Sequence, residues 1–141
     1  MLLLPKNFGS PNNPQMNMTV NFKDDDLSIS EVVEVFLEKN KINRKKTMFS
    51  AICVEEMVMN IFEYGFNDGK KHSIDIRVLI KGEEVTLRIR DDCRPFNPKK
   101  WYEFYNPEDL TAHIGIRLVA KMAKSIQYVN VMNLNYLTIK I

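Results

Sequence analysis

Hydrophobic and polar residues follow two periods along the chain, and these periods predict its secondary structure. Alternation of apolar and polar residues predicts strands with one buried face over residues 16–22, 74–80 and 85–89. Two closing strands are expected over residues 126–132 and 136–141. Apolar residues spaced by three and four are typical of helices, which we expect over about residues 28–40, 47–66 and 114–125.

The helical spacing also predicts which side chains of the two shorter helices face the core. Ser28 or Ser30 is expected to cap the first helix, and Ser28 has capping-box spacing to Glu31. Thr111 is the expected cap of the last helix. The side chains expected to point inward are Val32, Val33, Phe36 and Leu37 in the first helix, and Leu118, Val119 and Met122 in the last.

The order strand–helix–helix–strand–strand–helix–strand–strand predicts the fold class. It indicates an α+β two-layer sandwich, in which a mixed, mostly antiparallel sheet carries its helices on one face. Turns are expected at Lys81-Gly82-Glu83 and at Asn133-Leu134-Asn135. Residues 1–15, which contain prolines, a Gly-Ser pair and several asparagines, are expected to form a linker or arm, and residues 16–141 a single domain.

The helix over residues 47–66 is mostly apolar but carries a narrow polar stripe. Glu56, Asn60 and Glu63 lie together on a helical wheel, roughly opposite Val54 and Val58. A helix this apolar is expected to be buried. Asparagine is an indifferent helix former, and a buried carboxylate is costly without a partner. The stripe therefore needs either solvent or a ligand.

A second anomaly stands at the end of the strand over residues 85–89. The next position with inward parity is Asp91, so a carboxylate is delivered to the buried face of the sheet. Residues 92–98 then contain two prolines and are expected to form a loop.

Composition and charge narrow the function classes. The 141 residues suit one domain with a substantial core, and 45% hydrophobic and 27% charged residues are ordinary for a soluble globular protein. A net charge of +2 without a basic patch argues against nucleic-acid binding. Cys53 and Cys93 are too few for a disulfide scaffold, and reduced thiols in the cytoplasm are expected. No apolar run approaches the length of a membrane span.

Three features suit one kind of ligand if they converge in the fold. Asn60 and Glu56 offer the hard oxygen atoms that magnesium prefers. Asp91 can accept a hydrogen bond from an exocyclic amine such as that of adenine, and a helix that starts at Ile114-Gly115 offers free backbone N–H groups to phosphates. Together they indicate a magnesium–nucleotide pocket between the helices and the sheet. Taken singly, a helical glutamate is usually solvated and an aspartate after a strand usually belongs to a turn.

Four sequence motifs resemble those of the gyrase, chaperone, histidine-kinase and mismatch-repair (GHKL) ATPase superfamily. Glu56-x-x-x-Asn60-x-x-x-Tyr64-Gly65 resembles the first box, in particular the E-x-x-x-N-x-x-x-H/Y-G of the anti-sigma-factor serine/threonine kinases. Residues 90–98, RDDCRPFNP, resemble the second box, D-x-G-x-P-F-D-P. Residues 113–119, HIGIRLV, resemble the third, G-G-L-G-L-x-L-V, and residues 133–138, NLNYLT, the closing G-x-N-x-L-T strand.

The resemblance implies a role for each matched residue. Asn60 would hold Mg²⁺ through its amide oxygen, and Glu56 would orient or deprotonate the attacking hydroxyl or water as the catalytic residue. Asp91 and Cys93 would lie against the nucleotide, with Asp91 reading the adenine amino group. The backbone at Ile114 and Gly115 would hold the phosphates of ATP or ADP. The implied partners are a sigma factor or a small anti-anti-sigma-like protein in bacterial signalling, and a homodimer is a further expectation.

Two departures from the motifs leave the function open. Cys93 and His113 stand where the boxes have glycine, which lets the backbone approach a nucleotide closely. One hypothesis is therefore an active serine/threonine kinase, and a second is a nucleotide-sensing module without phosphate transfer. A third reading is a sandwich that kept the fold without the pocket. The chain is also compatible with the C-terminal domain of a larger membrane or regulatory protein.

Overall fold

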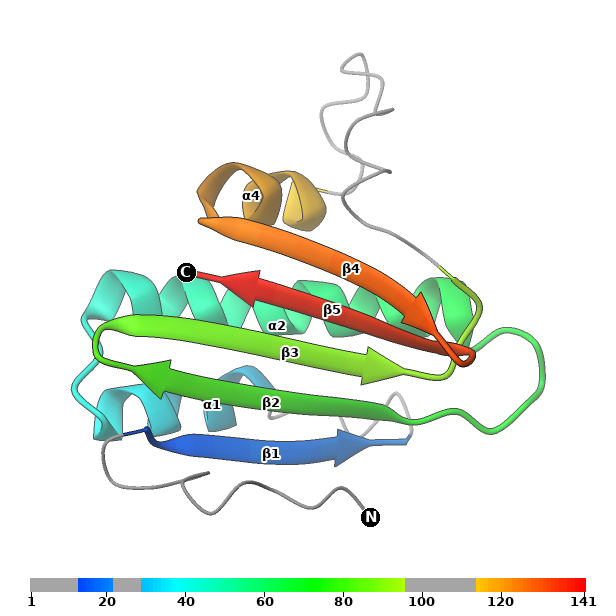
Figure 1. The fold of residues 1–141 in the computed structure, drawn as a ribbon, viewed down its shortest axis with the longest axis horizontal. Helices are drawn as coiled ribbons and strands as arrows, with labels where there is room; N and C mark the ends of the chain where they lie inside the picture. Colours follow the sequence, from blue (N-terminus) through cyan, green and yellow to red (C-terminus); the bar gives the residue numbers. More distant parts are fainter. Residues whose placement is uncertain (1–12, 22–28, 96–113) are drawn as a thin grey trace.

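The fold is an antiparallel sheet with helices layered on one face (Figure 1). The computed structural model describes residues 13–21, 29–95 and 114–141. Its strands are β1 (Gln15–Val20), β2 (Ile74–Lys81), β3 (Glu84–Asp91), β4 (Ser125–Val131) and β5 (Leu134–Lys140). Its helices are α1 (Ile29–Lys39), α2 (Arg44–Gly65) and α4 (Ile114–Met122).

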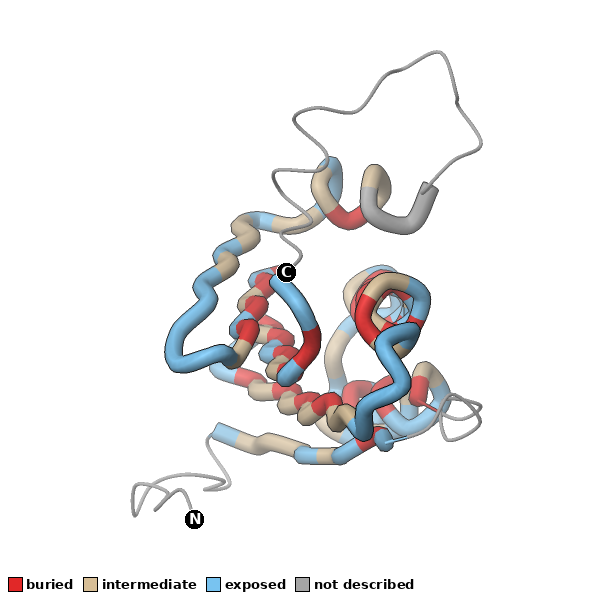
Figure 2. The backbone as a smooth tube through the Cα atoms, turned by 90° about the vertical axis from the view of Figure 1, so that its right-hand side faces the viewer, coloured by how far each residue is buried: buried red, intermediate tan, exposed pale blue. Residues whose placement is uncertain are grey.

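The strands are hydrogen-bonded in the order β1-β2-β3-β5-β4. Each of these described pairings is antiparallel, so the sheet is antiparallel throughout and not mixed as expected. Helices α1 and α2 pack together on one side of the sheet (Figure 2). Helix α4 packs against α2. The two-layer α+β sandwich predicted from the order of elements is therefore confirmed.

Helix α2 runs beneath the centre of the sheet and supplies much of the core (Figure 1). It begins at Arg44, slightly earlier than expected, because the Asn43 side chain accepts a hydrogen bond from the Lys46 N–H at 2.9 Å and caps the helix. Its buried residues include Cys53, Val54 and Val58. The prediction that this helix is buried is confirmed in part, because eleven of its 22 residues are buried, whereas Met48, Ile52 and Met59 are 37–38% exposed.

Two of the predicted inward side chains are exposed. Val32 in α1 is 39% exposed, and Met122 in α4 is 42% exposed. Helix α1 instead buries Ile29, Val33 and Leu37, which repeat every four residues and form a narrower stripe than the predicted one. Met122 is the last residue of α4, where the helix gives way to β4.

The hairpin turns set which residues point into the core. The β2–β3 turn contains Gly82 at φ +61°, in the left-handed region that suits glycine. The β4–β5 turn consists of Met132 and Asn133, both at positive φ, as a two-residue turn of type I′ requires. The expected turn over Asn133–Asn135 is therefore wrong by register, and Asn135 belongs to β5 with its side chain buried.

Several expectations concern residues outside the described ranges. They are most of the N-terminal arm, the caps Ser28 and Thr111, His113, and the last part of the loop expected over residues 92–98. None of the helices in the described part is long and apolar enough to cross a membrane.

Candidate functional site

Two buried polar side chains lie on neighbouring elements, one at the end of β3 and one on α2. Asp91, the last residue of β3, is 7% exposed, and Asn60 on α2 is 8% exposed. The loop after β3 is tied to α2, because the Arg94 Nε atom donates to the Tyr64 carbonyl oxygen at 2.6 Å. The structure thus brings the two sequence anomalies, the polar stripe of α2 and the inward carboxylate, to neighbouring elements.

The carboxylate of Asp91 is held by its own loop and by β5. Its Oδ1 atom accepts hydrogen bonds from the Cys93 backbone N–H at 3.0 Å and from the Asn135 Nδ2 atom at 2.8 Å. Burial raises the pKa of Asp91, and the hydrogen bonds from Asn135 and Cys93 oppose that rise. Burial of a carboxylate costs free energy, and a further hydrogen bond to it reduces that cost. Asp91 is therefore suited to a ligand that donates a hydrogen bond.

Asn135 is a member of this site to which the sequence reasoning assigned no role. Its Nδ2 atom also donates to the carbonyl oxygens of Cys93 and Arg94, at 2.9 and 3.3 Å. Its Oδ1 atom accepts from the Tyr128 hydroxyl and from Asn130 Nδ2. The side chain therefore orients Asp91 and fixes the following loop. The signal was present, since Asn135 is the asparagine matched in the closing motif.

Asn60 carries a buried amide with unused hydrogen-bonding capacity. Its Nδ2 atom is buried and has no hydrogen-bond partner among the described residues. Buried polar groups are nearly always paired, so an orphaned buried amide on the helix that packs against β3 indicates a place for a polar ligand. The oxygen and nitrogen of an amide exchange positions by a flip, so Asn60 can present either atom.

The three residues of the polar stripe of α2 differ in how far they are buried. Glu56, one helical turn before Asn60, is half-buried, whereas Glu63 is exposed to solvent. Asn60 is the fully buried member. Glu56 and Asn60 therefore form the part of the stripe that the fold partly encloses.

Cys93 fits closely against the C-terminal end of α2. A Cβ atom built on Gly65 would lie 2.5 Å from the Cβ atom and 2.6 Å from the Sγ atom of Cys93. The Cys93 side chain thus occupies the space that any larger residue at position 65 would need. Burial and the carboxylates of Asp91 and Asp92 raise the pKa of this thiol to about 12, so it stays protonated and hydrogen-bonds Asp91.

His72 joins the loop after α2 to the loop after β3. Its Nδ1 atom lies 3.1 Å from Asp92 Oδ1, and its Nε2 atom lies 2.8 Å from Asp68 Oδ1. These carboxylates, Asp68 foremost, raise the pKa of His72, because each stabilises the protonated ring. The His72 side chain is only 6% exposed, whereas the side chains of Asp68 and Asp92 are 40% and 41% exposed, so the bridge is buried at its centre and open to solvent at both ends.

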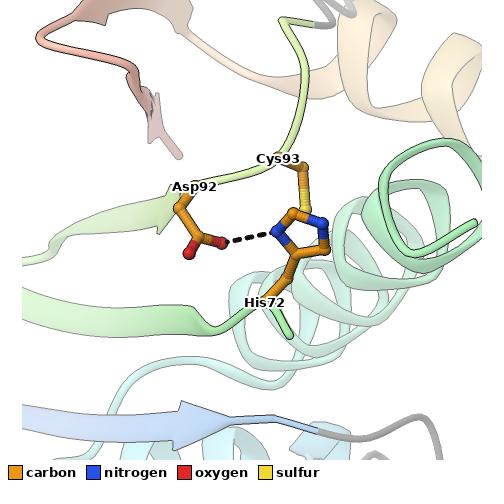
Figure 3. A group of neighbouring side chains, drawn as sticks. All are labelled: His72, Asp92 and Cys93. Atoms are coloured by element: carbon orange, nitrogen blue, oxygen red, sulfur yellow. Dashed lines mark hydrogen bonds and ion pairs between the residues drawn. The ribbon is translucent and has the colours of Figure 1, made fainter. Parts of the chain in front are cut away.

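Potential metal-ligand atoms of His72, Asp92 and Cys93 lie within 4.8 Å of one another (Figure 3). The sequence did not indicate this cluster, because the histidine and the cysteine come from separate loops. In the structure each ring nitrogen already faces a carboxylate and the thiol keeps its proton, so the cluster acts as a cross-link beside Asp91.

The remaining predicted site residues lie on α4. This helix begins at Ile114, as expected, so the Ile114-Gly115 backbone forms its first turn. Because α4 packs against α2, its start belongs to the same layer as Asn60. The first turn of a helix presents free N–H groups, which is the chemistry the sequence predicted for this position.

Comparison with known families identifies one match. The family model of the histidine kinase-like ATPase domain matches residues 22–141. A search of curated proteins finds no match.

Proposed function

Because the chain belongs to the histidine kinase-like ATPase domain family, we propose that it is a regulatory domain that binds Mg²⁺ with ATP or ADP. The observation that carries this proposal is that two buried polar groups lie on neighbouring elements, Asp91 at the end of β3 and Asn60 on α2. Asp91 supplies a buried acceptor for the adenine amino group, and Asn60 supplies an amide whose hydrogen-bonding capacity is unused.

The residues present suit a magnesium nucleotide. The amide oxygen of Asn60 is a hard ligand of the kind that Mg²⁺ prefers, and Glu56 lies one turn away on the same side of α2. The first turn of α4, at Ile114 and Gly115, offers N–H groups for phosphates. When bound, Mg-ATP supplies a transferable phosphoryl group whose charge the metal ion partly neutralises.

The finer proposal is a serine/threonine kinase of the anti-sigma-factor type. In this role Glu56 positions or deprotonates the attacking hydroxyl of a small protein partner, and the partly enclosed place of Glu56 supports it. The partner class proposed is a sigma factor or an anti-anti-sigma-like protein, with the chain acting as a homodimer.

A nucleotide-sensing module without transfer is the second candidate function. The observation that favours it is the side chain of Cys93, which stands where the second box has glycine. This side chain keeps its proton and fills the space against Gly65. Because phosphoryl transfer depends on accurate positioning, a pocket narrowed in this way can retain binding and lose turnover.

Nucleotide binding is tested by thermal unfolding. We expect Mg-ADP or Mg-ATP to raise the melting temperature, because a ligand at 100 times its Kd stabilises a protein by about 2.7 kcal/mol. Asp91→Asn is expected to abolish the rise, because the amide replaces a carboxylate that accepts from adenine. Asp92→Asn is the matched control, since Asp92 is exposed, and it should keep the rise. No shift of the wild-type protein at millimolar nucleotide would refute the proposal.

Phosphate transfer is tested separately with Glu56. In Glu56→Gln we expect transfer from labelled ATP to a protein substrate to fall by about 10²-fold or more, because general-base catalysis contributes roughly that much. The nucleotide-induced rise in melting temperature should remain. Glu63→Gln is the control, because Glu63 lies on the same helix and is exposed. Equal rates in the wild type and in Glu56→Gln would favour the sensing module.

A further inference from the structure

The sheet face opposite the helices carries its own set of polar side chains. The strand register places them in two rows that cross the sheet. One row is Asn17, Arg77, Arg88, Thr138 and Gln127, and the next is Thr19, Asp75, Arg90, Tyr136 and Val129. Helices α1 and α2 lie on the other side of the sheet (Figure 2), so no described helix covers these rows.

A hollow of about 420 Å³ lies over these rows, bordered by β1, β2, β3 and β5. A volume in this range suits a small organic ligand. The hollow is separated by the sheet from Asn60 and Asp91, whose side chains point to the helix side. It is therefore distinct from the proposed nucleotide site.

Positive charge is concentrated in the hollow. Arg77 and Arg88 are directly opposite each other on β2 and β3. Like charges in this arrangement destabilise a sheet. Burial and the positive charges of Arg88 and Arg90 lower the pKa of Arg77, and the negative charge of Asp75 opposes this by less. The surroundings therefore disfavour the positive charge of Arg77 on balance.

The carboxylate within the hollow is already engaged. Asp75 forms an ion pair with Arg90, whose Nε atom lies 3.1 Å from Asp75 Oδ2, and it accepts a hydrogen bond from the Thr19 hydroxyl at 2.8 Å. In the described chain, Arg88 forms no ion pair with a carboxylate, and its side chain is exposed. Arg77 has a partner on the sheet, because its Nε atom donates to Asn17 Oδ1 at 2.9 Å. Among the residues that line the hollow, three arginines face one carboxylate, so the lining carries an excess of two positive charges.

We propose that this hollow binds a phosphate monoester, with its dianionic phosphate held between Arg77 and Arg88. A guanidinium group matches phosphate geometry through paired N–H donors. A phosphate monoester carries about −1.5 to −2 charges at neutral pH, which balances the two guanidinium groups better than one carboxylate does. Tyr136, 40% exposed, and the Thr138 hydroxyl border the same space and contact the rest of the ligand.

The test uses the full chain labelled with ¹⁵N and titrated with O-phosphoserine. Amide resonances of β2, β3 and β5 are expected to shift with saturation. Arg88→Gln is expected to raise the Kd by tenfold or more, whereas Lys81→Gln, which changes an exposed cation outside the hollow, should leave it within twofold. The Asp91→Asn variant should bind O-phosphoserine as the wild type does, so this result is independent of the nucleotide proposal.

Two further measurements sharpen the test. Without ligand, Arg88→Gln is expected to melt no lower than the wild type, because it relieves the repulsion with Arg77. A phosphoserine peptide that binds tenfold tighter than the free amino acid would identify a protein source, and equal affinity would identify a small molecule. The proposal is overturned if O-phosphoserine at 10 mM shifts no outer-face resonance, if Arg88→Gln binds as the wild type does, or if unliganded Arg88→Gln melts lower.

Discussion

Replacement of Gly65 by alanine is expected to destabilise the protein by about 3 kcal/mol or more, at the upper end of the cost of overpacking. The new Cβ atom would lie 2.5 Å from the Cβ atom of Cys93, which is fixed to the backbone and cannot rotate away. Either the end of α2 or the loop after β3 must move. Because that loop follows Asp91, we also expect weaker nucleotide binding. Urea unfolding of the wild type and the variant measures the first effect.

The contact predicts strong coupling between positions 65 and 93. Cys93→Gly alone removes a small buried side chain, at a cost of roughly 1–2 kcal/mol. In Gly65→Ala/Cys93→Gly the Cβ and Sγ atoms of Cys93 are removed. The nearest remaining atom, the Cα atom of residue 93, is 3.9 Å from the new methyl group, so the clash is gone. Alanine at this last position of the helix then adds a part of the ~1 kcal/mol that it adds in a helix interior. The double variant should therefore be more stable than Gly65→Ala alone. Additive losses in this double-mutant cycle would show that the two residues do not interact.

Replacement of Asn135 by leucine should cost about 3 kcal/mol or more, because several buried groups lose their partner at once. The carboxylate of Asp91 and the carbonyl oxygens of Cys93 and Arg94 all accept from Asn135 Nδ2. With this donor gone, the pKa of Asp91 should rise further, and the carboxylate becomes a poorer acceptor for a ligand. We therefore expect the nucleotide-induced rise in melting temperature to disappear.

Asn130→Ala provides the control for this prediction. Asn130 is exposed and donates one hydrogen bond to Asn135, so its loss should cost about 1 kcal/mol or less. Urea unfolding and nucleotide titration of both variants compare the two roles. If Asn135→Leu unfolds at the same urea concentration as Asn130→Ala, the hydrogen bonds of Asn135 around Asp91 do not stabilise the fold.

Much of the fold was predictable because the relevant signals are local. Alternation along β2 and β3 determines the parity of each side chain, and this pattern is enough to place Asp91 on the buried face of the sheet. The faces of the short helices were less predictable. A helical wheel defines a broad apolar side, but α1 buries only a narrow stripe that leaves out Val32, and Met122 is exposed at the end of α4.

The wrong prediction of the turn before β5 is the reason that Asn135 was not identified as a site residue. Met132 and Asn133 both adopt positive φ, which is uncommon outside glycine, so the sequence pointed to a later turn. The actual two-residue turn shifts Asn135 into the strand. A shift of this kind decides which face a side chain occupies, because strand side chains alternate.

The residue types of the candidate site and the order of its motifs follow from the amino-acid sequence without further information. Asn60 and Asp91 were identifiable because their polarity conflicts with buried positions in a helix and a strand. Their partners, in contrast, depend on how the strands pair in three dimensions. Asp91 meets Asn135 through the register of β3 against β5, and Arg77 meets Arg88 through the register of β2 against β3. Such pairings join distant segments, and the cooperative packing that selects them has no counterpart in any local pattern.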